Sequence, residues 1–347
     1  MTKNKGIGAG FGFLAIILLW ICFASSTVND DGDTSYVKDM AGRSVKIETN
    51  SCYPIVALHA VPDQIIDRLA PDRHKTAQKN FVRSSLLMKT NDYDRVNALP
   101  LVSAFYEPSS TEKIVSLNPA FIVTLTKDPK LESRSTEFGG KPVLALSKDT
   151  LSELARDWKV MGNAIAYSKP LADKIFTYLQ DQEEIFANKA ATVSPKKRVW
   201  LANKDEFTIP APQTIMQDAM KHAGGLTYWD VIDYAESLDP TEESVKIPIE
   251  SMIDFDPEVI FCSDEATRQK IMSDERLKNV SAVQYGKVYA EKKAFRIDSM
   301  TSFAGTAWMM NRLYPDLLGV SDLDYAKEFY KVIFDSDITE KDIEIDN

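Results

Sequence analysis

A short segment occurs twice in this chain, and the repeat strongly constrains the fold. Residues 111–123 read TEKIVSLNPAFIV, and residues 249–261 read IESMIDFDPEVIF. Each copy has a Glu seven positions before a Pro, an amphipathic stretch between them, and an apolar run afterwards. Because the residue before a proline avoids the helical conformation, each copy predicts a helix ending at Asn118 or Asp256, then a buried strand. Two such copies indicate two similar lobes, and a cleft between lobes commonly binds small molecules.

The N-terminal 26 residues have the layout of a secretory signal. Lys3 and Lys5 precede an apolar run over residues 11–23, and small residues follow at positions 24–26. We therefore expect an exported protein, either periplasmic or at the cell surface. The same residues could instead remain as a membrane anchor or carry lipid on Cys22, and the sequence leaves these alternatives open.

Length and composition limit the class of protein. A chain of 347 residues favours two domains, and its formal net charge of -10 disfavours binding to nucleic acid. The chain has only three histidines, and no cysteine spacing suits a zinc site. Cys52 and Cys262 fall beside strands of different lobes, so we expect both to be buried and unpaired.

Apolar runs predict strands at 121–125 and 143–146, and Gly224 and Gly225 should end a helix over 214–222. Strands and helices alternate in this way along the chain, which is typical of parallel α/β lobes. Apolar residues recur with helical spacing from Leu171 to Phe186 and predict a helix over 169–191, with Ser168 as its cap and Pro170 in its first turn. About 22 residues give roughly 33 Å, enough to join two lobes rigidly. The expected fold is α/β, with two parallel-sheet lobes joined by one long rigid helix and a ligand cleft between them. The expected divisions are a signal or anchor (1–26), a tether (27–35), an N-terminal lobe (36–150), a helical segment (151–192), a C-terminal lobe (193–334) and a frayed acidic tail (335–347).

The second half of the chain resembles the helical-backbone, class III solute-binding proteins of ABC importers. The resemblance rests on PQTIMQDAMKHAGG (212–225), IPIESMIDFDPEVIF (247–261), LKNVSAVQYGKVYAEKKAFRID (277–298) and LYPDLLG (313–319). In the first half, VKDMAGRSVKI and EKIVSLNPAFIV are similar to the opening hairpin and the first-lobe helix and strand of that family. Members of this family carry ferric siderophores, haem and cobalamin to a dimeric membrane permease.

The resemblance also implies surface residues that dock on the importer. The second-lobe docking Glu of the family matches Glu250, whereas the first-lobe Glu is matched to Gln64, with Asp63 beside it. If docking needs a carboxylate on each lobe, Asp63 must supply the first one.

Ligand-binding candidates follow from the topology of parallel sheets, since ligands meet the loops at the carboxyl ends of the strands. Arginine and lysine can pair with an anionic chelate, and aromatic side chains give flat contact surfaces. The imidazole of His59 or the phenol of Tyr106 could ligate iron directly. The candidate ligand-binding residues are His59, Arg83, Tyr106, Lys127, Trp200, Lys204, Trp229 and Arg296.

These features favour a monomeric binding protein without an intrinsic cofactor, which carries a metal chelate, in the first instance a ferric one. One alternative is a binding protein for a bare metal ion or an oxyanion. Another is an extracytoplasmic enzyme on a related two-lobed scaffold. Against the enzyme, the chain has no G-x-S-x-G, H-E-x-x-H, P-loop or G-x-G-x-x-G motif.

Overall fold

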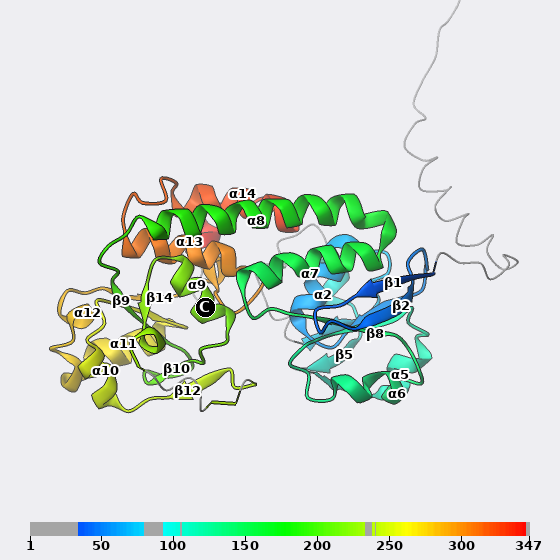
Figure 1. Cartoon of the computed structure of the whole chain (residues 1–347), viewed down its shortest axis with the longest axis horizontal. Coiled ribbons are helices and arrows are strands. Elements are labelled where there is room, and N and C mark those ends of the chain that lie inside the picture. The colour runs from blue at the N-terminus through cyan, green and yellow to red at the C-terminus, as the bar shows by residue number, and fades with distance from the viewer. Residues whose placement is uncertain (1–33, 80–92, 105, 233–237, 240, 345–347) are drawn as a thin grey trace, which may run out of the picture.

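The structure is a computed structural model, and it describes residues 34–79, 93–104, 106–232, 238–239 and 241–344. Two α/β lobes lie at opposite ends of the molecule (Figure 1). The 23-residue helix α8 (Lys169–Ala191) runs over both lobes, as the long apolar stripe in its sequence predicts. The predicted fold class of two parallel-sheet lobes joined by a long helix is therefore confirmed.

Lobe one is built around a small parallel sheet with the strand order β3-β7-β8. Every residue of these three strands is buried, which explains why their sequences are continuously apolar. An antiparallel hairpin precedes the sheet, and a second small sheet has the order β4-β5-β6. The elements are β1 (Thr34–Lys38), β2 (Ser44–Glu48), β3 (Ile55–Ala57), α2 (Ala60–Leu69), β4 (Ala77–Gln78), α4 (Tyr93–Asn97), β5 (Leu101–Ala104), β6 (Glu107–Pro108), α5 (Thr111–Ser116), β7 (Phe121–Leu125), η3 (Leu131–Ser133), α6 (Arg134–Glu137) and β8 (Val143–Leu146).

Lobe two contains a parallel sheet with the strand order β11-β9-β13-β14. An antiparallel pair, β10 with β12, lies beside this sheet, and helices α9 to α14 complete the lobe. The elements are β9 (Arg198–Ala202), β10 (Thr208–Pro210), α9 (Ile215–His222), β11 (Leu226–Thr227), η5 (Tyr228–Asp230), β12 (Ser244–Lys246), α10 (Ile249–Phe255), β13 (Val259–Cys262), α11 (Glu265–Ser273), η7 (Glu275–Leu277), α12 (Ser281–Gln284), β14 (Val288–Ala290), η8 (Lys293–Phe295), α13 (Ser302–Leu313) and α14 (Asp322–Phe334).

The sequence repeat forms the same unit in each lobe, α5 followed by β7 and α10 followed by β13. Helix α10 ends at Phe255, next to Asp256 as predicted, whereas α5 ends at Ser116, two residues before the predicted Asn118. Asn118 has a φ of 47° and Asp256 a φ of 45°, so both residues are left-handed. Asn and Asp tolerate this conformation better than other non-glycine residues, which accounts for their place before each proline.

The segment between the lobes is a pair of packed helices, α7 (Leu151–Ala164) and α8. Pro170 lies in the first turn of α8, as predicted. Ser168 was expected to cap this helix, but its hydroxyl donates to the carbonyl of Ile165 at 3.2 Å and leaves the helix without a side-chain cap. Proline tolerates this because it has no N–H to satisfy.

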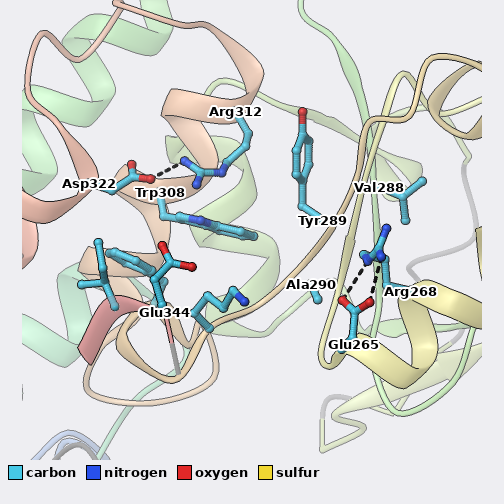
Figure 2. Close-up of a pocket in the computed structure, with 12 residues that line it drawn as sticks. Glu265, Arg268, Val288, Tyr289, Ala290, Trp308, Arg312, Asp322 and Glu344 are labelled. Carbon is cyan, nitrogen blue, oxygen red and sulfur yellow. Dashed lines mark hydrogen bonds and ion pairs between the residues drawn. The ribbon is translucent and has the colours of Figure 1, made fainter. Parts of the chain in front are cut away.

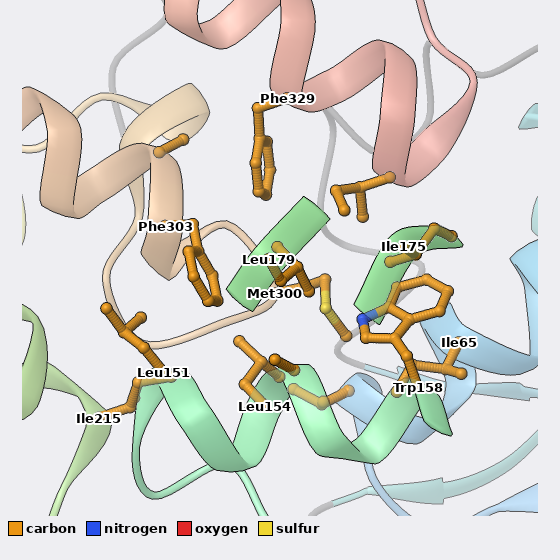
Figure 3. Close-up of a cluster of buried hydrophobic side chains, with 14 of the residues drawn as sticks. Ile65, Leu151, Leu154, Trp158, Ile175, Leu179, Ile215, Met300, Phe303 and Phe329 are labelled. Carbon is orange, nitrogen blue, oxygen red and sulfur yellow. The ribbon is translucent and has the colours of Figure 1, made fainter. Parts of the chain in front are cut away.

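One hydrophobic core passes through the join between the lobes (Figure 3). Figure 3 shows Ile65 of lobe one near Trp158 of α7, and Phe303 of lobe two near Leu179 of α8. These side chains are at most 1% exposed. Relative movement of the lobes would therefore disturb close packing rather than bend an open linker.

The C-terminal segment up to Glu344 folds, which corrects the prediction that residues from 335 onwards fray. Helix α15 (Glu340–Ile343) follows α14, and Ile338 and Ile343 are buried in the main core. Buried and exposed positions alternate in this segment, and the many acidic residues made that pattern hard to recognise in the sequence. Helix α14, which leads into this segment, contacts lobe one, because Arg68 donates to the carbonyl of Ile333 at 3.0 Å.

Cys52 and Cys262 are both unpaired, as predicted, and Cys262 is buried. Cys52 is exposed, which corrects the prediction that both thiols are buried. Among the described residues no helix is long and apolar enough to span a membrane. The predicted signal or anchor over residues 1–26 lies outside this part of the chain.

Candidate functional site

The lobe-one side of the candidate site is a stacked pair of rings, His59 and Tyr106. His59 follows β3 and caps α2, where its Nδ1 accepts a hydrogen bond from the N–H of Val61 at 3.2 Å. Tyr106 lies between β5 and β6, and its N–H donates to the carbonyl of Leu58 at 3.0 Å. The ring centroids are 5.4 Å apart, and the ring planes differ by 29°. Backbone groups of Leu58 and Val61, just after β3, therefore hold both residues in place.

Both rings are uncharged near neutral pH. Burial lowers the pKa of His59 to about 3. The positive charge of Lys148 lowers this pKa further, whereas the negative charge of Asp298 raises it. Burial also raises the pKa of Tyr106, and the negative charge of Glu243 adds to this effect. Asp298 and Glu243 belong to lobe two, so charges from both lobes act on these two rings.

Lys127 joins the two lobes directly. It follows β7, and its Nζ lies 3.0 Å from Oδ1 of Asp149, which follows β8. The same ammonium donates to the carbonyl of Gln213 in lobe two at 2.9 Å. A second contact pairs Nζ of Lys148 with Oε2 of Glu243 at 3.8 Å. The carboxyl ends of the lobe-one strands therefore meet lobe two here.

Lobe two contributes an ion pair beyond β14. The guanidinium of Arg296 binds Asp298 through two hydrogen bonds, of 3.0 Å and 2.6 Å. Burial opposes ionisation of Asp298, but Arg296 outweighs it and holds the pKa of Asp298 below its usual range. Burial, with Asp298 nearby, raises the pKa of Glu291 well above its usual range.

We call this convergence the interlobe site. It contains three cations and three carboxylates besides the two rings, and each cation has a carboxylate partner. Such a site can bind a large polar ligand by exchanging interlobe contacts for ligand contacts. Its residues are His59, Tyr106, Lys127, Lys148, Asp149, Gln213, Glu243, Arg296 and Asp298.

Trp200 and Trp229 are core residues of lobe two, which corrects their predicted role as ligand contacts. Trp200 is 1% exposed, packs against Tyr228 and Phe255, and donates from Nε1 to the carbonyl of Glu206 at 3.2 Å. Trp229 is 8% exposed and donates from Nε1 to the carbonyl of Pro210 at 2.8 Å. A strand sequence does not reveal which face of the sheet an aromatic residue covers.

Two further candidates do not join the interlobe site. Lys204 lies in the turn after β9 with a φ of 72°, and its Nζ donates to Oγ of Ser244 at 3.0 Å on an exposed surface. Arg83 lies outside the described residues. Of the eight predicted ligand-binding residues, four belong to the interlobe site. His59 and Tyr106 stack on each other, Lys127 pairs with Asp149, whose charge acts on Tyr106, and Arg296 pairs with Asp298, whose charge acts on His59.

The first-lobe docking residues are also corrected. Asp63 is 1% exposed and Gln64 is 5% exposed, so neither presents a side chain to a partner protein. Oδ1 of Asp63 lies 2.9 Å from Nε2 of His74, and Oδ2 accepts from the N–H of Gln78 at 2.6 Å. Glu250, in contrast, is exposed in the first turn of α10.

Sequence reasoning missed five members of the interlobe site. Lys148 and Asp149 lie two and three residues after the end of β8, so the rule that ligands meet the loops at strand ends could have found them. Gln213, Glu243 and Asp298 lie in irregular segments without a recognisable pattern, and only the tertiary structure brings them to the site.

Two further observations concern possible ligand sites. Within the described residues, no group of three or more His, Cys, Asp or Glu side chains is arranged to hold a metal ion. A pocket of about 310 Å³ lies beside β14, with Tyr289 and Trp308 among its lining residues (Figure 2). Its arginines are engaged, Arg268 with Glu265 at 2.8 Å and Arg312 with Asp322. None of the described lobe-one residues lines this pocket, and no residue of the interlobe site is among its lining residues.

Comparisons with known proteins agree with this architecture. An ABC transporter solute-binding protein from Sulfurospirillum deleyianum is 16% identical, with a TM-score of 0.74 over 90% of this chain and 98% of that one. The molybdate periplasmic binding protein MolA of Haemophilus influenzae is 17% identical, with a TM-score of 0.68 over 88% of this chain and 99% of that one. The periplasmic vitamin B12 binding protein BtuF of Vibrio cholerae is 16% identical, with a TM-score of 0.60 over 77% and 98%.

No curated protein matches the chain. The profile of the periplasmic binding protein family matches residues 55–294, which include the central sheets of both lobes and α8. Since this match extends over more than half of the sequence, the chain belongs to the periplasmic binding protein family.

Proposed function

We propose that the protein captures a metal chelate outside the cytoplasm, in the first instance a ferric one, and delivers it to an ABC importer. The observation that carries this proposal is the interlobe site, where Lys127 bonds Gln213 across the lobes beside the rings of His59 and Tyr106. Lysine and arginine suit an anionic chelate, and the neutral rings suit its organic part. Family members bind solutes, so we assign no catalytic step.

A bare oxyanion is the second candidate, because the similar Haemophilus protein binds molybdate. The charges of the interlobe site favour a larger ligand. Asp149, Glu243 and Asp298 all lie among its cations, and they would repel a small anion at close range. A chelate can reach the cations with its own polar groups and place apolar parts near the carboxylates.

A thermal-shift screen of the purified chain tests the proposal. The panel contains ferric catecholate, ferric citrate, haem, cobalamin, free Fe³⁺, Ni²⁺ and Zn²⁺, and molybdate. A ligand at 100 times its dissociation constant should stabilise the chain by about 2.7 kcal/mol. We expect a shift with a chelate. A response to molybdate or a free metal alone would replace this proposal with the second type of cargo.

A matched pair of lysine variants locates the binding site. Lys127→Met removes the cation that contacts both Asp149 and Gln213, and should weaken binding of the chelate at least tenfold. Lys204→Met removes an exposed lysine outside the interlobe site and should leave binding unchanged. Equal effects of the two substitutions on the dissociation constant would contradict the location that we propose.

We also propose that Glu112 and Glu250 are the paired contacts with the importer. The two residues occupy the same position in the repeat, in the first turns of α5 and α10, and both are exposed. Each is followed three positions later by an exposed apolar residue, Val115 at 37% and Ile253 at 41% exposure. Glu112 therefore replaces Asp63 as the lobe-one partner of Glu250.

Uptake of a radiolabelled chelate by cells separates docking from binding. Glu112→Ala and Glu250→Ala should each reduce uptake, while the dissociation constant of the purified protein stays unchanged. Glu132→Ala changes another exposed lobe-one carboxylate and serves as the control. Normal uptake by the double variant Glu112→Ala/Glu250→Ala would refute this docking surface.

A further inference from the structure

Tyr106 has a backbone conformation that is unusual for a large side chain. Its φ is 71°, in the left-handed region, although it is not a glycine. Such a conformation persists only where the surrounding structure holds it, and it often occurs at functional positions. Its N–H is bound to the carbonyl of Leu58, but that bond fixes only one side of the residue.

Arg134 fixes the other side of Tyr106. Nη2 of Arg134 donates to the carbonyl oxygen of Tyr106 at 2.6 Å. The guanidinium also binds Asp128 through Nε at 2.8 Å and through Nη2 at 3.0 Å, and Nη1 binds Glu137 at 2.8 Å. The side chains of Arg134 and Asp128 are both 0% exposed. This fork of fixed hydrogen bonds is a rigid support, which a lysine could not reproduce.

The support begins at the sheet. Thr124 is buried in β7, and its hydroxyl donates to Oδ2 of Asp128 at 2.7 Å. Asp128 also accepts from the N–H of Lys130 at 2.9 Å, so its carboxylate is fixed from several directions. A continuous series of contacts thus runs from β7 through Asp128 and Arg134 to the backbone of Tyr106.

The ring of Tyr106 is the end point of this series. It is half-buried and stacked on His59, within the interlobe site. An ion pair buried only for stability would often be replaced by apolar residues at no cost, so an expensive buried support suggests a role in orientation. A flat, fixed ring in a ligand site favours ligands that offer a flat ring of their own.

We infer that the buried Arg134–Asp128 pair positions Tyr106, and that the Tyr106 ring makes the interlobe site select metal chelates bearing an aromatic ring over ring-free chelates. Arg134 is a positioning residue, because it acts through the backbone of Tyr106 and does not itself reach the ligand. This inference rests on the proposed function, since it names the class of chelate that the same site prefers.

The test compares two anionic ferric complexes, with 2,3-dihydroxybenzoate and with citrate, by their dissociation constants for the full chain. Tyr106→Asn removes the ring but keeps a residue that tolerates positive φ, whereas Tyr106→Phe keeps the ring. Tyr106→Asn should weaken binding of the dihydroxybenzoate complex about 2- to 13-fold and leave the citrate complex within about twofold. Tyr106→Phe should keep the preference for the dihydroxybenzoate complex over the citrate complex, because the ring remains.

The positioning role is tested with the double variant Arg134→Met/Asp128→Leu. It removes both buried charges together, so that neither is left buried without the other. It should lose the preference for the dihydroxybenzoate complex as Tyr106→Asn does, with a normal dissociation constant for citrate. Arg198→Met is the control, because it breaks an ion pair with Asp256 in lobe two, away from the interlobe site.

The outcomes are distinct. A folded double variant that keeps the preference would overturn the role of Arg134, and equal weakening of both complexes by Tyr106→Asn would overturn the role of the ring. If the unmodified chain binds citrate at least as tightly as dihydroxybenzoate, the inferred selectivity is wrong, while the proposed function stands. If it binds neither these complexes nor any other chelate of the thermal-shift panel, the proposed function itself fails.

Discussion

The buried histidine of lobe one offers a quantitative test of the electrostatics. Nε2 of His74 lies 2.9 Å from Asp63, and Nδ1 lies 2.8 Å from Asp67, which also pairs with Arg95. Burial alone would lower the pKa of His74, but the two carboxylates reverse that effect and raise its pKa to about 9, from an ordinary value of 6.5. The folded state therefore binds this proton more tightly than the unfolded state does.

The pKa difference sets the size and direction of the effect on stability. It corresponds to about 3 kcal/mol at most, present in full below pH 6.5 and lost as the pH rises through 9. Burial raises the pKa of Asp63 even with His74 beside it, so burying that carboxylate has a cost that His74 only offsets. The pH dependence therefore follows the proton on His74, and we expect a net contribution below the maximum, about 1–3 kcal/mol.

The perturbation is His74→Gln, and the assay is urea unfolding at pH 6 and at pH 10. The free energy of unfolding should differ between the unmodified chain and the variant by about 1–3 kcal/mol more at pH 6 than at pH 10. Taking this difference cancels the titration of most other groups. His222→Gln is the control, since that ring is 20% exposed and its pairs with Asp218 and Glu183 are more solvated, so we expect under about 1 kcal/mol. A difference that does not change with pH would refute the reasoning.

Three further predictions concern packing and charge. Trp200→Ala should lower the free energy of unfolding by about 3–5 kcal/mol, because the indole is fully buried; a loss under about 1 kcal/mol in chemical denaturation would contradict its place in the core. Gly305→Ala should cost about 1–3 kcal/mol, since the new Cβ would lie 2.7 Å from the carbonyl oxygen of Phe295, and an unchanged melting temperature would show that α13 can shift freely. Cys262 should resist alkylation until the chain unfolds while Cys52 reacts in the folded state, as mass spectrometry can check; equal rates would contradict their burial.

Much of the fold is readable from local patterns. The continuously apolar runs at β7 and β8 predicted strands with the observed bounds, because both faces of these strands are covered. The apolar stripe and Pro170 located α8. Gly224, with a φ of 88°, follows the end of α9 as expected, because glycine adopts this left-handed conformation readily. Ile338 and Ile343 were missed because their burial depends on contacts with distant helices, which an acidic local sequence conceals.

The candidate site was only partly predictable. His59 and Lys127 follow strands, so topology alone placed them at the edge of the sheet where ligands bind. The prediction that Trp200 contacts the ligand was wrong, because the two faces of a buried strand look alike in sequence. The prediction that Asp63 docks on the importer was wrong, because folding brings His74, eleven positions further along the chain, against its buried carboxylate.

By itself, the sequence determined that two similar α/β lobes flank a long helix, since the repeat and the hydrophobic periodicity are properties of neighbouring residues. Only the tertiary structure decided which polar side chains meet between the lobes. Lys127 reaches Gln213, 86 positions away, and Arg134 supports Tyr106, 28 positions before it. Such contacts depend on how the lobes pack against one another and on which way each loop turns, and no local pattern records either of these.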